Sequence, residues 1–398
     1  MDRRAFIEKL FERARQRAGD AADFACEACF GQNEEFEVQV KNGEIYQYNV
    51  SDDGGLGFRV LVNGRMGYAS TQNLSEDEAA RIVRTARDNA LLLETEEQEF
   101  LGEGGREYET VSDGLVPQPT AEEQVKLALE AQEKLYAADK MVIDGSSTEV
   151  ISIKSSVAIM NSRGLDLYHE NSNNVVVSAA VVSDGSEMNN SFELRFGDLK
   201  EIDVEALINE SVSGAKSKLG ADVAPTGAYP VVFAPKAMTS LLSTFSGAFS
   251  SEAARKGLSR LLDSEGKAIA SEAVTLTDDP FYPESPAKMP FDAEGTPTRR
   301  KNIIEKGELK TLLYNLKSAA ALGKETTGNA SKGSYASSVG ISPFTMCLAP
   351  GDLSEEELLK KKININLDAL QANEKRYEAY KLEQQALKIL DNKVIYAV

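Results

Sequence analysis

The sequence predicts an α+β protein with several domains, built from largely antiparallel sheets that carry packed helices. Asn42-Gly43 and Asn63-Gly64 each separate two strand-like apolar runs, which is the strongest short-range signal of a β-hairpin. Helical periodicity falls in separate segments without regular strand-helix alternation, which argues against a doubly wound parallel sheet. The length of 398 residues exceeds what one hydrophobic core usually supports.

The first domain, residues 1–115, is predicted to be a small α+β unit. Apolar residues at helical spacing predict a helix over 2–18, ahead of the two hairpins. Ser75 with Glu78 has the capping-box signature of a second helix. Residues 94–119 are rich in Glu, Gly and Pro without an apolar period, and are predicted to form a linker.

The middle domain, residues 116–222, is predicted to combine helices and strands. Thr120 and Glu123 form a second capping-box signature, which opens a helix that runs to about residue 138. Successive strands are expected over 150–183, and a further helix over 203–219.

The last domain, residues 223–398, is predicted to be β-rich with an atypical, shortened end. Its first elements are expected to be a strand over 230–233 and a helical, Ser- and Ala-rich stretch over 236–262. Hairpin signals follow at Lys306-Gly307 and Asp391-Asn392.

Charge and composition exclude several classes of partner. The chain has 44 Lys and Arg against 63 Asp and Glu, a formal charge of -19, which repels nucleic acid and anionic bilayers. No apolar run approaches the roughly 20 residues of a membrane span, and the first residues lack the apolar region of a signal peptide. We therefore expect a cytoplasmic protein that binds neither nucleic acid nor membrane.

Cysteine and histidine are too sparse for several kinds of active site. Cys26 and Cys29 lie in a predicted strand, where residues three apart point to opposite faces, so we expect two buried structural thiols. The one histidine is His169. A single imidazole excludes the paired histidines of HExxH zinc sites, and no GxSxG motif accompanies it for a serine triad.

Two loops carry most of the remaining candidate chemistry. In the first, Asp292 and Glu294 lie close to Arg299 and Arg300. These residues could bind a cation and clamp a substrate carboxylate, or they could cross-link a long loop through ion pairs.

The second loop, around Gly328 and Asn329, lacks the spacing of a phosphate-binding loop, so a backbone-lined turn close to a groove is expected. Gly54, Gly55 and Gly57 precede a strand rather than a helix. They are expected to permit a bend or a close backbone approach.

Four stretches in order resemble the TldD/PmbA peptidase family: Val40 to Glu44, Asp53 to Val60, the loop that starts at Phe291, and Thr327 to Ala330. The resemblance is to the PmbA (TldE) branch, which lacks the zinc-binding motif. It implies a cytoplasmic PmbA-type subunit that pairs with a zinc-bearing, TldD-type catalytic subunit. Such a pair processes peptides or unfolded polypeptides.

Catalytic members of that family carry an HExxxH segment on a helix, with a cysteine ligand near the C-terminal end. The resemblance places Leu242 and Gly247 where the histidines would stand, and Ser243 at the glutamate. Cys347 lies too early to be the missing thiolate. The implied site therefore has no catalytic residue, metal or cofactor in this chain, and zinc is expected in the TldD-type partner.

The C-terminal end departs from the family pattern from about residue 360, and a charged, helix-like run over 374–390 stands in its place. This departure leaves a second hypothesis, a homo-oligomeric peptide-binding or scaffold protein without peptidase activity. A third, an independent hydrolase that uses Asp292 and Glu294, has no evident nucleophile or metal ligand beside them.

Overall fold

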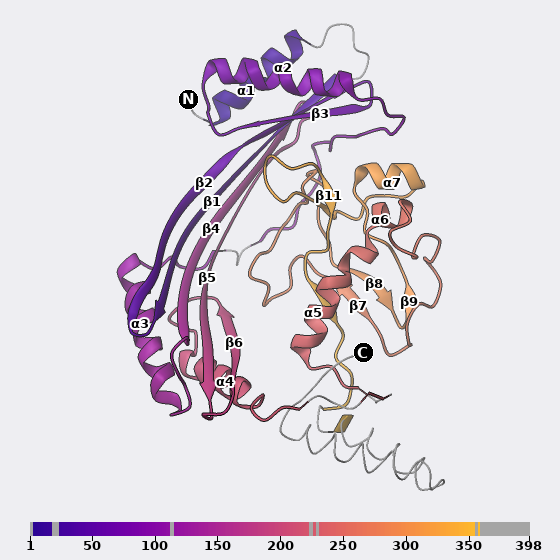
Figure 1. Ribbon diagram of the computed structural model, residues 1–398. Coiled ribbons are helices and arrows are strands. Elements are labelled where there is room, and N and C mark those ends of the chain that lie inside the picture. Colours follow the sequence, from indigo (N-terminus) through magenta and orange to yellow (C-terminus); the bar gives the residue numbers. More distant parts are fainter. Residues whose placement is uncertain are drawn as a thin grey trace, which may run out of the picture.

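The computed structural model describes residues 3–17, 24–111, 115–222, 226–227, 231–354 and 357–358 (Figure 1). The helices are α1 Arg3–Gln16, α2 Glu76–Leu92, α3 Ala121–Ala138, α4 Val204–Lys216, α5 Pro235–Phe245, the 3-10 helix η1 Ser246–Phe249, α6 Ser251–Arg255 and α7 Leu316–Leu322. The strands are β1 Phe24–Lys41, β2 Glu44–Val62, β3 Arg65–Thr71, β4 Ser147–Asn161, β5 Asp166–Ser183, β6 Met188–Phe196, β7 Leu276–Asp278, β8 Lys301–Glu305, β9 Glu308–Leu309, β10 Ala330–Ser331, β11 Gly340–Ile341 and β12 Met346–Leu348.

One antiparallel sheet dominates the molecule, with the strand order β3-β2-β1-β4-β5-β6. It contains strands from both sides of residue 115, so the first two predicted units share one sheet. Figure 1 shows that its long strands curve, with the C-terminal elements on the concave side. These elements include a smaller sheet of order β12-β7-β8-β9 and the helices α5 to α7. The predicted α+β class with antiparallel sheets is confirmed.

The hairpin turns follow the sequence signals. Asn42 and Gly43 have φ of 54° and 75°, and Asn63 and Gly64 have φ of 51° and 77°. Two consecutive residues with positive φ fit a type I′ turn, whose twist matches that of the flanking strands. The turn between β8 and β9 at Lys306-Gly307 has the same signs of φ.

The two faces of β1 are buried against different partners, as the cysteine spacing predicts. Cys26 packs in the core formed with α1 and α2, whereas Cys29 packs with Ile159 and Phe291 on the opposite face. Burial raises the pKa of both thiols. Buried, protonated thiols on opposite faces confirm the prediction of two structural cysteines.

Helix ends follow the capping signals in part. The Thr120-Glu123 capping box is complete, and Ser75 accepts a hydrogen bond from the Glu78 amide. The prediction that the Glu78 carboxylate accepts a hydrogen bond from the Ser75 backbone amide is wrong. This carboxylate accepts from the Arg81 guanidinium group instead.

Two predictions for the last domain need correction. Residues 231–234 form no strand; they are partly exposed, and the helix that begins at Pro235 follows at once. The helix predicted over 236–262 is broken after Phe245, because the Ser250 hydroxyl caps a separate helix by accepting from the Ala253 amide. The helix-like run 374–390 and the turn signal at 391–392 lie outside the described residues.

The linker over 94–119 forms neither helix nor strand in its described residues. Part of it lies beneath the C-terminal elements, since Leu101 is buried and a Cβ on Gly102 would lie 2.1 Å from the Glu294 carbonyl oxygen. Among the described residues, no helix is both long enough and apolar enough to cross a bilayer.

The glycines of β2 permit the close approach that their sequence suggests. An added Cβ on Gly55 would meet the Tyr335 ring at 2.4 Å, and one on Gly57 would lie 1.7 Å from the Tyr335 carbonyl oxygen. The loop that contains Tyr335 therefore rests directly on the strand backbone.

Substituting Gly57→Ala is expected to lower the free energy of unfolding by about 1–3 kcal/mol, because backbone must shift to admit the methyl group. Gly351→Ala is the matched control, since an added Cβ there has no neighbour within 4 Å. Urea denaturation of both variants tests the contact. Equal stability of the two variants would show that Tyr335 does not rest on β2.

Candidate functional site

Asp292 organises the loop that the sequence singled out. Its side chain is 2% exposed and accepts hydrogen bonds from the backbone amides of Glu294 and Thr296, each at 2.9 Å, and of Ala330 at 3.0 Å. Burial raises the pKa of this carboxyl group, and the three amides oppose that rise. The side chain therefore joins the loop to β10 through backbone groups.

Glu294 reaches in two directions from the same loop. Its carboxylate accepts from the Leu316 amide, at 2.8 Å, at the start of α7. On the side of the large sheet it lies within the electrostatic reach of Arg59, whose Nε donates to Glu27 at 2.7 Å. Burial raises the pKa of Glu294, and the positive charge of Arg59 opposes the rise.

The two arginines of the loop lie apart from these carboxylates. Arg299 and Arg300 are exposed, and Arg300 Nε is 3.6 Å from an oxygen of Asp279. The structure thus brings Asp292 and Glu294 together and leaves both arginines at the surface. Within the described residues, hydrogen bonds that backbone amides donate to these two carboxylates hold the loop.

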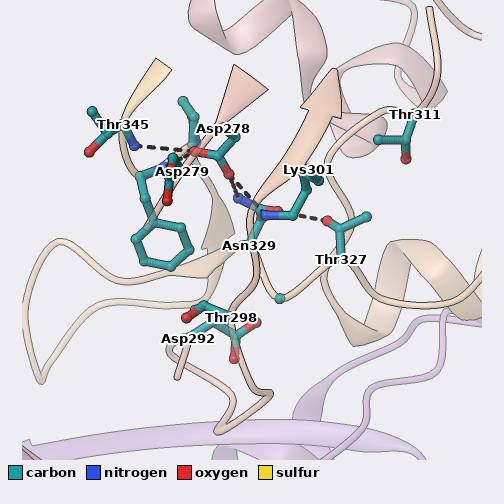
Figure 2. Close-up of polar contacts among 12 residues, drawn as sticks. Asp278, Asp279, Asp292, Thr298, Lys301, Thr311, Thr327, Asn329 and Thr345 are labelled. Carbon is teal, nitrogen blue, oxygen red and sulfur yellow. Dashed lines mark hydrogen bonds and ion pairs between the residues drawn. The ribbon is translucent and has the colours of Figure 1, made fainter. Parts of the chain in front are cut away.

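The loop around Asn329 is fixed by a buried polar cluster (Figure 2). Asn329 Nδ2 donates to Asp278 Oδ2 at 2.8 Å and to the Ser342 carbonyl at 3.1 Å. Lys301 Nζ binds the same Asp278 oxygen at 3.0 Å, and the Thr327 hydroxyl donates to Asn329 Oδ1 at 2.8 Å. Burial lowers the pKa of Lys301, and Asp278 opposes this effect.

Asp278 and Lys301 are the cluster residues that sequence reasoning missed. Each is a charged residue at one end of a short strand, and no spacing marks either one. The glycine of the same loop was identified. Gly328 has a φ of 70°, and an added Cβ would lie 2.7 Å from the Pro297 carbonyl oxygen, so this loop and the Asp292 loop touch through their backbones.

A cavity of about 610 Å³ lies between these loops and the concave face of the large sheet. Strands β1, β4 and β5 line one side, and residues 289–293 and 330–335 line the other. His169 lies in this wall with Nε2 2.6 Å from the Lys288 carbonyl oxygen, so it has a backbone partner. Cavities of this size hold small ligands or short peptide segments.

The positions that the family resemblance assigned to metal ligands lie on α5 and η1. Leu242 packs against the C-terminal core, and Ser243 offers a hydroxyl group. Gly247, on η1, has no side chain. These groups do not fit zinc, which is held by imidazole, thiolate or carboxylate ligands. Among the described residues, no three His, Cys, Asp or Glu side chains gather in a metal-binding arrangement.

Comparison with known families identifies a curved sheet with a smaller sheet and short helices on its concave side as the architecture of a metallopeptidase-like protein. Models of the PmbA/TldA metallopeptidase domain 1, central domain and C-terminal domain match residues 26–90, 115–219 and 226–367. The chain therefore belongs to the PmbA/TldD family.

Individual relatives agree with this assignment. Metalloprotease PmbA of Escherichia coli O157:H7 is 26% identical over 338 residues, covering 82% of this chain and 74% of the relative. A crystal structure from Thermotoga maritima has a TM-score of 0.80 at 28% identity, covering 90% of this chain and 80% of that one. TldE from Thermococcus kodakarensis shares the fold, with a TM-score of 0.76 at 24% identity and coverage of 89% and 80%.

Replacing Asn329→Ala is expected to cost about 1–3 kcal/mol of unfolding free energy, because buried partners at Asp278 and Ser342 lose a donor. Asn189→Ala removes an exposed hydrogen bond to the Lys218 carbonyl and should change stability by less than about 0.5 kcal/mol. Chemical denaturation compares them. Similar losses in both variants would contradict a structural role for the cluster.

Glu294→Gln is expected to change how stability depends on pH. The folded pKa of Glu294 lies above its ordinary value of 4.5, so the wild-type chain loses stability as pH rises from that value through the folded pKa. Glutamine cannot ionise and still accepts from the Leu316 amide, so the variant should lose less stability over that range. Parallel pH profiles of the two proteins would contradict a buried, proton-retaining Glu294.

Proposed function

We propose that this chain is a non-catalytic, PmbA-type subunit that pairs with a TldD-type, zinc-bearing peptidase subunit and holds the substrate for it. The substrate class is peptides or unfolded polypeptides, and the compartment is the cytoplasm. The observation that carries the proposal is the side-chain chemistry on α5 and η1. A leucine, a serine and a glycine stand where the resemblance puts the groups that hold and assist the metal.

In this proposal, the residues of this chain bind the peptide substrate. The cavity lies on the concave face of an exposed sheet, and the sheet has strand edges that are open in the described structure. An extended peptide can add to such an edge through its backbone, which makes the binding largely independent of sequence. That property suits unfolded substrates.

A homo-oligomeric peptide-binding or scaffold protein is the second candidate. It is favoured by exposed apolar side chains on the half of β2 that β3 does not cover, since β3 pairs with residues 56–62. Tyr46, Tyr48 and Val50 are 67%, 52% and 72% exposed there. Exposed apolar patches near a strand edge are typical of surfaces that associate with another chain.

Mixing the purified chain with a TldD-type subunit should raise the cleavage rate of a fluorescence-quenched unfolded peptide at least several-fold over either protein alone. The physical reason is that substrate-binding groups and metal would lie on different chains. A Ser243→Ala variant serves as the matched control. Since Ser243 is exposed and no ligand role is assigned to it, this variant should support the same stimulation. Equal rates with and without this chain would reject the subunit proposal.

Light scattering of the isolated chain and of the mixture separates the two candidates. A heteromeric complex with raised activity supports the subunit proposal. A stable homo-oligomer that binds peptide and leaves the rate unchanged supports the scaffold.

A further inference from the structure

The lower concave face is the surface that carries a further inference. We define it as the concave-side residues of β1, β4, β5 and β6 that continue the cavity wall away from Asn171. Strand register places one row across it as Glu37, Ile151, Val175 and Phe196. The next row is Gln39, Glu149, Val177 and Leu194. The opposite face of these strands is covered by α3 and α4.

One side of this face is apolar and open. Exposed and partly buried residues alternate along β6, because Arg195 and Asn189 point toward α4 and its C-terminal turn, which they contact. The residues between them face the other way, and Phe192 and Phe196 are 61% and 46% exposed. Large aromatic side chains with this much exposed surface are typical of a binding surface for another molecule.

The other side of the same face is acidic. Glu37 and Glu149 lie diagonally across β1 and β4, and the proximity of Glu37 adds to burial in raising the pKa of Glu149. Glu37 also accepts hydrogen bonds from the amides of Gln47 and Asn49, which carry no charge, and the Glu149 carboxyl group lies within hydrogen-bonding reach of it. Among the described residues, neither carboxylate has a Lys or Arg within 4.0 Å. Burial and two like charges on adjacent strands are unfavourable, so Glu149 keeps its proton up to a pKa of about 7, and a cation bound between the two groups would favour the ionised pair.

A third observation marks the upper end, where this face meets the cavity. Asn171 is only 9% exposed and lines the cavity, and its Oδ1 has no hydrogen-bond partner in the described structure. Its Nδ2 lies 3.5 Å from the sulfur of Met289, a weak acceptor on a flexible side chain. A buried amide oxygen without a donor is unfavourable, and a backbone N–H of a bound peptide would supply one once the amide or Met289 rotates.

The chain already holds one lysine against this surface. Lys236, in the first turn of α5, pairs with the Glu193 carboxylate, donates to the Phe192 carbonyl at 3.2 Å and places its Nζ 5.9 Å from the Phe192 ring centroid. An ammonium group beside an aromatic ring, a carbonyl and a carboxylate shows how a lysine can be held at the β6 side of this face. The same contact ties α5 to β6, so the helix with the altered metal positions lies beside this face.

We propose that the lower concave face binds extended polypeptide segments that combine lysine or arginine with apolar side chains. The apolar side chains pack on β5 and β6, the cation lies between Glu37 and Glu149, and a backbone N–H bonds to Asn171. The inference rests on the proposed peptide-holding role and specifies its substrate class.

The test measures binding to the isolated chain, without a catalytic partner. Three labelled peptides of equal length alternate leucine with lysine, with serine or with glutamate, and fluorescence anisotropy gives each Kd at low ionic strength. The lysine peptide should bind about five-fold or more tighter than the serine peptide, and the glutamate peptide most weakly. Added salt should reduce the difference. Equal affinities for the lysine and serine peptides would overturn the inference.

Two double variants test whether the preference for the lysine peptide arises from the lower concave face. Glu37→Gln with Glu149→Gln should abolish the lysine preference. Above pH 7, where Glu149 is ionised, Glu130→Gln with Glu133→Gln makes the same change of net charge on the exposed side of α3 and should preserve the preference. If both double variants lose the preference equally, the overall charge of the chain is responsible and the inference is wrong.

Phe192→Ser, at an exposed position, should weaken the binding of all three peptides by a similar factor. Unchanged affinities would exclude a role for the apolar side chains of β6.

Failure here is distinguishable from failure of the subunit proposal. A lysine preference in the isolated chain without stimulation of a TldD-type subunit supports the binding face and rejects the pairing. Stimulation without any lysine preference supports the pairing and rejects the binding face.

Discussion

A buried ion pair in the large sheet lies where the linker and the C-terminal elements pack on its upper concave face, and the architecture there depends on it. Glu27 and Arg59 pair on adjacent strands, with side chains 0% and 3% exposed, and Arg59 lies within electrostatic reach of Glu294. Removing one partner from such a buried pair costs about 3–5 kcal/mol, because the other charge is left without compensation. Asn161 extends the contact by donating to the Gly102 carbonyl, so the linker is fixed in the same place.

The C-terminal elements cover the upper end of the sheet, and among the described residues the β6 side of the lower concave face stays exposed, with Phe192 and Phe196 61% and 46% exposed. The cavity forms where the covered and open parts meet, between strand residues and the two loops held by Asp292 and Asn329. Those loops owe their shape to hydrogen bonds between side chains and backbone, so their most buried polar groups are structural. The groups that remain available to a ligand lie on the sheet itself.

Local patterns in the sequence predicted the local structure well. Asn-Gly pairs predicted the hairpins because both positions require positive φ, and the spacing of Cys26 and Cys29 predicted opposite faces because side chains alternate along a strand. The break after Phe245 was missed because Ser250 acts as a helix cap within a segment whose composition favours helix. The strand over 230–233 was overpredicted from β-branched residues, since strand formation also requires a neighbouring strand.

The candidate site could be predicted only where residues adjacent in sequence act together. Asp292 and Glu294 were recognised as a pair, but two of their partners are backbone amides distant in sequence, that of Leu316 and, 38 positions from Asp292, that of Ala330. Asp278 and Lys301 meet only through the pairing of β7 with β8. The facing of Glu149 and Glu37 likewise follows from strand register, which a single sequence does not specify.

The described helices α5 and η1 present no imidazole, thiolate or carboxylate side chain that could hold zinc, and we propose that the metal for hydrolysis comes from another subunit. Elemental analysis of the purified, isolated chain after equilibration with zinc and gel filtration tests it most directly. The account predicts far less than one zinc ion per chain and no chelator-sensitive peptide cleavage. One tightly bound zinc ion per chain, with cleavage that chelation abolishes, would contradict it.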